Sequence, residues 1–378
     1  MRKVHRYARR LIEFDTTSHK SNRLACKYIE MKLAKHGFVV EKVDYLDKNR
    51  QRKINLIAKK GAGVGGLAYF GHIDTVPADF WTFERAGPFE PTVFNERLYG
   101  RGACDMKGSV ACMMDASQQF DWDQLKQPFY FVITADEEIG FLGAKAVVKE
   151  SEFYREMVEN RTKAIIGEPT GLDVVHAHKG SLTLMAHSKG QEAHSSSRAG
   201  KNANLAMIPF LNELLAIHEV TEQDSNWHDN DFDPPTLSLN IGIRDSSTAL
   251  NIKAGGSTAT AYLRPMPGVN VEPILERLKS TADRLGIELT ISRSCEPFWK
   301  NPNSEFVRQT LKLLHRQSSK TVCYATDAGV LVDLPDKIVL GPGNIAQAHT
   351  ADEWISLEQL ERGTEVYAKL IQHWCCQE

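Results

Sequence analysis

Five metal-compatible side chains each follow a short apolar run in this sequence, in segments marked by Gly, Asp or Pro. They are His72, Asp105, Glu138, Glu168 and His349. Imidazole nitrogens and carboxylate oxygens are ligands that Zn²⁺ accepts. Two histidines and three carboxylates would suit a pair of zinc ions, and a paired zinc site can hydrolyse amides.

The coordination of such a pair can be counted. If one carboxylate bridges, each ion receives one histidine, one terminal carboxylate, the bridging carboxylate and a shared water, so both ions are four-coordinate. Two divalent ions outweigh three carboxylates by one positive charge, which favours hydroxide over water at the shared position. Hydroxide is the nucleophile that a hydrolase requires.

The elements that must position these residues alternate between strand-like and helix-like patterns. We expect helices at 4–15, 20–36, 108–119 and 141–150, and strands at 38–45, 54–59, 66–71, 128–134 and 163–167. This order predicts an α/β fold with a mixed β-sheet flanked by helices.

The pattern changes near Lys179. Strands at 181–187, 236–243, 257–264 and 287–293 and helices at 202–219 and 271–285 give the order β-α-β-β-α-β, which is that of a ferredoxin-like α+β unit. Segments after 295, with helices at 304–316 and 356–373 and a strand at 337–340, resume the first pattern and carry His349. The sequence therefore predicts one domain from residues 1–178 and 295–378, and a second domain inserted at 179–294.

Composition excludes several classes of partner. The chain has 378 residues, 42% of them hydrophobic, which favours two domains over one. Its formal net charge is −2 and it has no basic run interleaved with aromatics, so no nucleic-acid partner is expected. No apolar stretch approaches the roughly 20 residues that span a bilayer, and residues 1–10 lack the apolar core of a signal peptide. We expect a soluble cytoplasmic protein.

The cysteines predict no thiolate metal site. Seven of them are scattered without zinc-finger or CxxC spacing, so we expect reduced structural thiols. Cys104 adjoins Asp105, but neighbours on an extended segment point to opposite faces.

Each motif also has a plainer interpretation. Asp74 lies two residues after His72, on the same side of an extended chain, and could hold the imidazole in one tautomer; the pair could equally belong to an ordinary turn. Asp105, ahead of an apolar helix, could be a simple N-cap. The acidic run at 136–138 could be a solvated loop. Glu168 and His349 repeat the arrangement of a polar residue after an apolar strand, and five such strand ends together favour a site at the carboxyl edge of the sheet.

The motifs carry a family resemblance. The segments GHIDTVP, YGRGACDMKG, TADEEIG, IIGEPT and GPGNIAQAHTADEW resemble the family of zinc-dependent deacylases and peptidases that includes acetylornithine deacetylase and succinyl-diaminopimelate desuccinylase. The likeness covers nearly the whole chain in the same order. IIGEPTGLDVVHAHKGSL and LGPGNIAQAHTADEW are most similar to acetylornithine deacetylase.

The resemblance implies a role for each residue of the first domain, which would be a zinc-peptidase-like catalytic domain. Two Zn²⁺ per subunit, replaceable by Co²⁺, would be bound by His72 with Glu168, by Glu138 with His349, and by a bridging Asp105. Glu137 would be the general acid/base, and Asp74 would orient His72. Glu137 would take a proton from the attacking water and return it to the departing amine.

The resemblance also implies functions for the inserted domain, as a lid and dimerisation domain. His194 would reach the active site of a partner subunit and stabilise the oxyanion, so a homodimer is expected. Arg264 and Asn251 would contact the substrate's carboxylate end, although either could be an ordinary strand-end residue. His178 and Lys179 are weaker candidates.

The implied reaction is metal-dependent hydrolysis of an N-acyl amino acid. N-acetyl-L-ornithine, in arginine biosynthesis, is the first expectation; N-acetylcitrulline, N-succinyl-diaminopimelate, another N-acyl amino acid or a dipeptide are alternatives. In the loop 324–329, near the substrate in the family, some acetylornithine deacetylases have glutamate where this chain has Asp327, which leaves the amine open. A non-catalytic scaffold of the same fold is the alternative of another class, and the intact ligands and base argue against it.

Overall fold

In the computed structural model, which describes residues 2–247 and 249–377, the chain divides into two compact units. Unit 1 comprises Met1–Ala177, Trp299–Lys320 and Thr326–Glu378, and unit 2 comprises His178–Phe298 and Thr321–Ala325. The junctions expected at 178/179 and 294/295 lie close to these boundaries. Nothing in the residue pattern indicates that Thr321–Ala325 groups with unit 2.

Unit 1 is built on a mixed sheet with the strand order β1-β2-β6-β3-β7-β15-β8-β13, and β14 pairs with β8. The strands are β1 (Val39–Leu46), β2 (Arg52–Lys60), β3 (Leu67–His72), β6 (Phe129–Thr134), β7 (Lys163–Ile166), β8 (Val175–His178), β13 (Phe298–Trp299), β14 (Lys320–Val322) and β15 (Lys337–Val339). β3 pairs in parallel with β6 and β7, and β7 pairs in parallel with β15. The carboxyl ends of these four strands therefore meet at one edge of the sheet.

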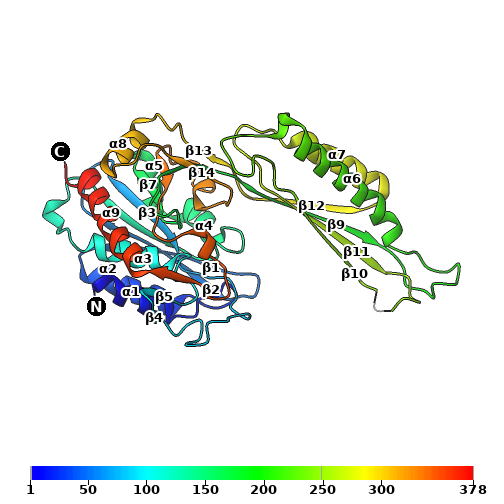
Figure 1. The fold of residues 1–378 in the computed structure, drawn as a ribbon, viewed down its shortest axis with the longest axis horizontal. Coiled ribbons are helices and arrows are strands. Elements are labelled where there is room, and N and C mark those ends of the chain that lie inside the picture. Colours follow the sequence, from blue (N-terminus) through cyan, green and yellow to red (C-terminus); the bar gives the residue numbers. More distant parts are fainter. Residues whose placement is uncertain (1, 248, 378) are drawn as a thin grey trace. The chain divides into compact units, whose positions relative to one another are not determined.

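Helices cover both faces of this sheet, which explains why β3 and β6 are buried along their whole length. The helices are α1 (Lys3–Ile12), α2 (Arg23–Lys35), α3 (Lys107–Ser117), α4 (Leu142–Glu150), α5 (Glu152–Glu159), α8 (Glu305–Leu313) and α9 (Leu357–Cys375). α3 packs against α1, α9 and β3, whereas α4 and α5 pack against β2 (Figure 1). Short 3₁₀ helices lie at Trp122–Gln124 (η1), Ser225–Trp227 (η2), Asp327–Gly329 (η3) and Ile345–Gln347 (η4).

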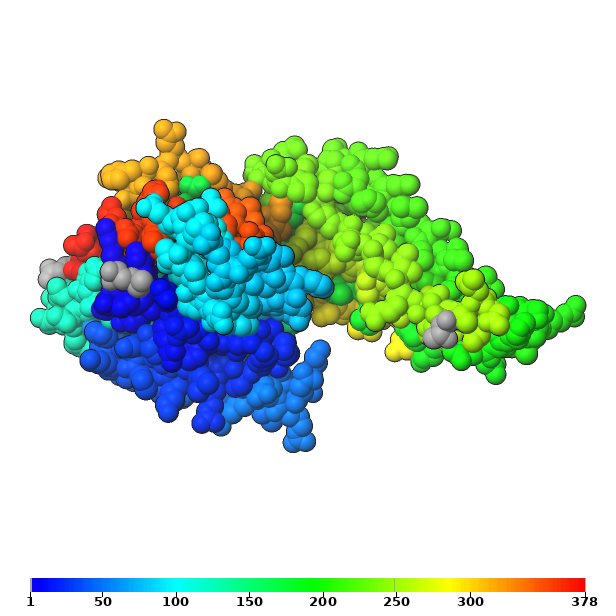
Figure 2. Space-filling model, turned by 60° about the horizontal axis from the view of Figure 1, so that its bottom comes forward, coloured from blue at the N-terminus to red at the C-terminus, as the bar shows by residue number. Residues whose placement is uncertain are grey.

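A small second sheet in unit 1 is not predicted from the sequence. It has the order β16-β5-β4, formed by β4 (Thr92–Phe94), β5 (Arg97–Tyr99) and β16 (Trp354–Ser356). Three-residue strands are too short to display an alternation of apolar and polar residues. The light blue to cyan residues of Figure 2, which include the segment between β3 and β5, lie at the surface of unit 1.

Unit 2 has the predicted element order, β9 (Ser181–Lys189), α6 (Asn204–Gln223), β10 (Asn240–Asp245), β11 (Gly256–Leu263), α7 (Glu272–Leu285) and β12 (Glu288–Cys295). Its sheet is antiparallel with the order β10-β11-β9-β12. Burial alternates residue by residue along β11 because α6 and α7 pack against the sheet while the other face is more exposed. Among the described residues of the whole chain, no helix is long and apolar enough to cross a membrane.

Candidate metal centre

The five expected ligands converge at the edge of the sheet where the parallel strands end. His72 is the last residue of β3, Glu138 follows β6, Glu168 follows β7, and His349 follows β15 and η4. Asp105 lies in the turn before α3. Each ligand therefore comes from a different strand end or turn, and the sheet fixes their separation.

The ligand atoms form two groups of three that share Asp105. His72, Asp105 and Glu168 make one group, and Asp105, Glu138 and His349 make the other, with the ligand atoms of each group within 4.8 Å of one another. His72 Nε2 lies 3.0 Å from Asp105 Oδ1 and 3.7 Å from Glu168 Oε1. His349 Nε2 lies 3.3 Å from Asp105 Oδ2 and 3.0 Å from Glu138 Oε2.

These distances fit two tetrahedral metal ions. Two ligand atoms bound to one zinc at about 2.0–2.1 Å are roughly 3.3 Å apart, which is the range found between the imidazole and carboxylate atoms. Asp105 turns one oxygen to each histidine. A carboxylate in this position can bridge two cations, so the residues present fit a dinuclear site.

The negative charge of the clustered carboxylates also favours the binding of cations. Burial raises the pKa of Glu168 well above its usual range, and the neighbouring Asp105 carboxylate adds to the effect. Burial and the Asp105 carboxylate likewise raise the pKa of Glu138. Although burial works against it, the Asp105 and Asp74 carboxylates hold the pKa of His72 well above its usual value. Divalent ions between these groups would relieve the repulsion among the carboxylates.

The loop that carries Glu168 closely approaches the loop that leads to His349. A Cβ at Gly341 would lie 2.2 Å from the carbonyl oxygen of Gly167, so only glycine allows this spacing. Gly171 N–H donates to the carbonyl of Gly343 at 2.6 Å, which ties the loops to each other. His349 itself has a φ of +62°, a left-handed conformation in which histidine is enriched among non-glycine residues.

A buried carboxylate that the sequence analysis missed organises the turn of Asp105. Glu353 is 1% exposed and accepts hydrogen bonds from the backbone N–H groups of Gly102 (3.0 Å), Cys104 (2.8 Å) and Asp105 (3.0 Å) and from Arg101 Nη1 (2.9 Å). α3 begins at Lys107, and no side chain caps it. The N-cap interpretation of Asp105 is therefore wrong, and its carboxylate remains available to metals.

The acidic turn after β6 is fastened by Asp74. The Asp74 carboxylate accepts the backbone N–H of Glu137 at 3.1 Å and of Glu138 at 3.3 Å. His72 Nδ1 lies 3.0 Å from the Asp74 carbonyl oxygen and 3.6 Å from its carboxylate. Asp74 thus contacts both His72 and the turn that carries Glu137, and the carbonyl is the nearer partner of the imidazole.

Glu137 is 8% exposed beside the two ligand groups. Burial raises its pKa well above the usual value, with the Glu168 and Glu138 carboxylates adding to the effect against the opposing charge of His72. Asp327, in η3, is buried nearby: it accepts from Thr134 Oγ1 at 2.9 Å, and burial raises its pKa to about 6. Within the described residues its Oδ1 has no hydrogen-bond partner.

The candidate substrate residues of unit 2 fall into two places. Exposed His194 and Asn251 lie on neighbouring segments, because Ser195 N–H donates to the Asn251 carbonyl at 2.8 Å. Arg264 lies past the other end of β11 with its guanidinium over the ring of Tyr262. β11 has 8 residues, so the two places are separated by roughly 25 Å. One unit 2 by itself therefore does not bring these three residues together.

Lys179, a weaker candidate, is engaged elsewhere. Its ammonium donates to the carbonyl oxygens of Pro234 (2.7 Å) and Thr236 (2.5 Å), and Ser238 Oγ lies at 3.4 Å. His178 Nδ1 lies 2.8 Å from the Lys179 carbonyl oxygen. These contacts favour a structural role for both residues. All seven cysteines are free thiols, and Cys104 directs its Sγ to the carbonyl of Asn344 at 3.3 Å.

We predict that Glu353→Gln destabilises the protein and weakens metal binding. The amide would replace one acceptor oxygen with a donor that faces N–H groups, and losing hydrogen bonds to a buried charge costs about 2–4 kcal/mol. Thermal unfolding with and without added zinc measures both effects. The control is Asp352→Asn at the exposed neighbouring position, and equal behaviour of the two variants would contradict the prediction.

Comparisons with known proteins agree with this geometry. The model of peptidase family M20/M25/M40 matches residues 68–373. The acetylornithine deacetylase of Myxococcus xanthus is 32% identical over 380 residues, covering 97% of this chain and 96% of its own. That of Pectobacterium carotovorum is 34% identical over 332 residues, covering 85% and 84%.

Solved structures share the fold. A metallo-carboxypeptidase of the M20 family from Sulfolobus solfataricus superimposes with a TM-score of 0.78 at 16% identity, covering 99% of each chain. A Bacillus subtilis protein described as a dinuclear metal-binding peptidase of the M20 family gives 0.66 at 14% identity, covering 98% of this chain and 97% of its own. The chain belongs to peptidase family M20/M25/M40 and is a metal-dependent amidohydrolase.

Proposed function

We propose that the protein hydrolyses the amide bond of an N-acyl amino acid, and that its substrate is N-acetyl-L-ornithine, giving L-ornithine and acetate for arginine biosynthesis. The observation that carries the reaction type is the pair of ligand groups sharing Asp105, with Glu137 buried beside them. The substrate rests on relatives named acetylornithine deacetylase, which are 32% and 34% identical over most of the chain. A cytoplasmic location is part of this proposal.

His72 with Glu168, and Glu138 with His349, would each hold one metal ion, and Asp105 would bridge the two. We propose zinc, replaceable by cobalt, because the donor set is nitrogen and oxygen at tetrahedral spacing. Bound metals supply Lewis acidity that polarises the acyl carbonyl and lowers the pKa of water. Asp74 would keep His72 oriented from the Nδ1 side.

Glu137 would move the proton of the reaction. Its backbone is fixed by the bond to Asp74, and its carboxylate is nearly excluded from solvent. A carboxylate held beside the metal centre can take a proton from the attacking water and return it to the departing amine nitrogen. Glu138, the next residue, faces His349 instead, so the adjacent glutamates have different tasks.

We further propose a homodimer in which His194 and Asn251 serve the site of the partner subunit and Arg264 serves its own. Their placement at opposite ends of β11 supports a site shared between two copies. α6 exposes Leu205, Ile208 and Leu215 at helical spacing on one side, each at least half exposed. The sheet order also leaves β10 at an edge. An exposed apolar stripe and an open strand edge both favour association with a second copy.

The substrate is tested with metal-loaded protein and five compounds, N-acetyl-ornithine, N-acetylcitrulline, N-succinyl-diaminopimelate, N-acetylmethionine and a dipeptide. We expect the highest kcat/KM for N-acetyl-ornithine. A chelator should remove the activity, and added zinc or cobalt should restore it. A preference for the succinyl compound or the dipeptide would overturn the proposed substrate while leaving the reaction type intact.

For the general base, we predict that Glu137→Gln lowers kcat by about 10²–10⁴-fold while metal content stays at the wild-type level. The amide keeps the size of the side chain but cannot accept the proton. Turnover and metal content of the same sample are the two measurements. Near-normal turnover in this variant would show that another group moves the proton.

The shared site predicts complementation between inactive subunits. Glu137→Gln and His194→Ala homodimers should both be nearly inactive, whereas a mixture refolded or co-expressed together should recover about a quarter of wild-type activity, because half of the dimers are mixed and each has one intact site. Mixing two samples of the same variant is the control. Absence of recovery in verified mixed dimers would place His194 in the site of its own subunit, whereas an active His194→Ala homodimer would place it outside catalysis.

A further inference from the structure

Asp136, the first residue of the acidic turn, is neither a metal ligand nor the proposed base, yet it is fully buried with a φ of +54°. Few non-glycine residues adopt this left-handed conformation, and it persists where surrounding contacts impose it. Glu137 follows directly, so the direction of its side chain depends on how Asp136 is fixed.

Two side chains on neighbouring strands fix the Asp136 carboxylate. Lys53 Nζ lies 2.8 Å from Asp136 Oδ1, and Tyr45 Oη donates to Asp136 Oδ2 at 2.7 Å. Tyr45 on β1 and Lys53 on β2 are direct partners in the antiparallel register, so both reach Asp136 from the same face of the sheet. Each oxygen of the carboxylate is thus assigned to a different donor.

Lys53 is also linked to Asp74, the second carboxylate that holds the acidic turn. Its ammonium donates to the carbonyl oxygens of Ser18 and, at 2.8 Å, Lys20. Ser18 Oγ donates to Asp74 Oδ2 at 2.8 Å, and Asp74 accepts the backbone N–H groups of Glu137 and Glu138. With its three hydrogen bonds Lys53 holds both Asp136 and the segment that supports Asp74.

The same strand holds the chain just before the turn. The last paired residues of β2 and β6 are Leu56 and Ile133, and beyond them Asn55 Oδ1 accepts the N–H of Ala135 at 2.9 Å. A Cβ at Gly143 would lie 2.3 Å from the Ala135 carbonyl oxygen and 2.5 Å from Asn55 Oδ1. Lys53 and Asn55 therefore extend the contact between β2 and the segment that leads to Glu137.

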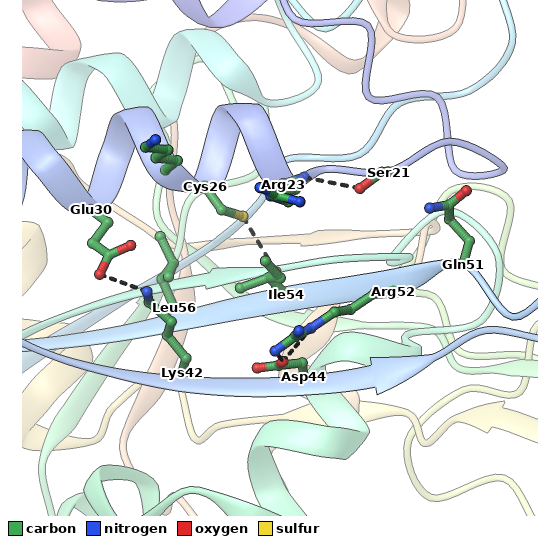
Figure 3. A pocket seen from close by; sticks show the side chains of 11 residues that line it. Ser21, Arg23, Cys26, Glu30, Lys42, Asp44, Gln51, Arg52, Ile54 and Leu56 are labelled. Atoms are coloured by element: carbon green, nitrogen blue, oxygen red, sulfur yellow. Dashed lines mark hydrogen bonds and ion pairs between the residues drawn. The ribbon is translucent and has the colours of Figure 1, made fainter.

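Lys53 does not face the pocket on the other side of β2. Arg52, Ile54 and Leu56 point there into a pocket of about 420 Å³ beneath α2 (Figure 3). Four charged residues around this pocket form two ion pairs, Lys42 with Glu30 and Arg52 with Asp44. Alternation along the strand sends Lys53 to the face of the acidic turn.

We propose that Lys53 is a positioning residue for the hydrolytic reaction: with Tyr45 it fixes the Asp136 carboxylate, and it thereby sets the direction in which Glu137 presents its side chain to the metal centre. The inference rests on the proposed role of Glu137 as the base. Stability alone does not account for a buried ion pair, because two apolar side chains in its place often give a protein that is at least as stable.

The primary test compares Lys53→Met with Lys60→Met in the full-length, metal-loaded protein. Lys60 is a second buried lysine of β2, at the other end of the strand, and its ammonium donates to the carbonyl of Phe120. We expect Lys53→Met to lower kcat by about 10- to 100-fold, the effect of a displaced catalytic group, with KM and metal content within about twofold of wild type. Lys60→Met should change none of the three by more than about twofold.

A second pair of variants separates positioning from stability. Lys53→Met leaves Asp136 as a buried, partly uncompensated charge, whereas Lys53→Met with Asp136→Asn removes that charge. We expect the double variant to recover thermal stability while kcat stays low. Recovery of kcat together with stability would show that Lys53 acts only as a structural support and would overturn the proposal.

Tyr45→Phe removes only one hydroxyl, and it tests the same proposal if Lys53→Met does not fold. It should lower kcat about 3- to 10-fold with unchanged KM, by losing one of the two bonds to Asp136. A folded, metal-loaded Lys53→Met protein with kcat within twofold of wild type, or an equal loss in Lys60→Met, would overturn the proposal. If Lys53→Met does not fold, an unchanged kcat in Tyr45→Phe would have the same meaning.

Amide hydrogen exchange tests the inference without any substrate. A peptide covering residues 129–141 should exchange faster in Lys53→Met than in wild type. Asp74 accepts the N–H groups of Glu137 and Glu138, and in this variant the Ser18 segment that supports Asp74 loses its bond to Lys53. Lys60→Met should leave the exchange unchanged. Unchanged exchange in Lys53→Met would count against the proposal. If instead wild-type protein hydrolyses none of the five compounds, or Glu137→Gln stays active, the proposed function fails, and the exchange result still decides whether Lys53 fixes the turn.

Discussion

Burial of several carboxylates at one edge of a sheet is the constraint on which the rest of unit 1 depends. The side chains of Asp105, Glu137, Glu138 and Glu168 are largely removed from solvent, and they lie with the buried His72 and the half-exposed His349. Desolvation and mutual repulsion both oppose their ionised forms. The fold stabilises buried carboxylates in two ways. Some are arranged so that divalent cations can bind between them, and others accept hydrogen bonds from fixed donors around the site.

The surrounding carboxylates show the second of these ways. Glu353 is satisfied by three backbone N–H groups and Arg101, Asp74 by the N–H groups of the acidic turn and Ser18, and Asp136 by Lys53 and Tyr45. None of these three acids is grouped with the metal ligands among the described residues. Aspartate and glutamate side chains thus serve as metal ligands where they face one another and the histidines, and as structural acceptors where fixed hydrogen-bond donors surround them.

Much of this arrangement could be predicted from the sequence. Apolar runs followed by His72, Glu138, Glu168 and His349 predict strand ends, and parallel strands bring such ends together. Glu353 could not be found in this way, because it bonds to a backbone 248 residues away and no spacing rule connects the two positions. Lys53 is equally hidden, since a lysine in a strand usually reaches solvent. For Asp105 the competing cap interpretation could be decided only by the position at which α3 begins.

The sharing of Asp105 between the two ligand groups has a consequence for the order of events during synthesis of the chain on the ribosome. His72, Asp105 and Glu168 have all been synthesised when less than half of the chain exists, but the turn of Asp105 is held by Glu353, and the second group needs His349. Neither group is complete in geometry until the last helix of the chain begins to emerge. We therefore expect metal to bind late in synthesis, because an interrupted chain would have the ligands of one group without the fixed geometry that retains an ion.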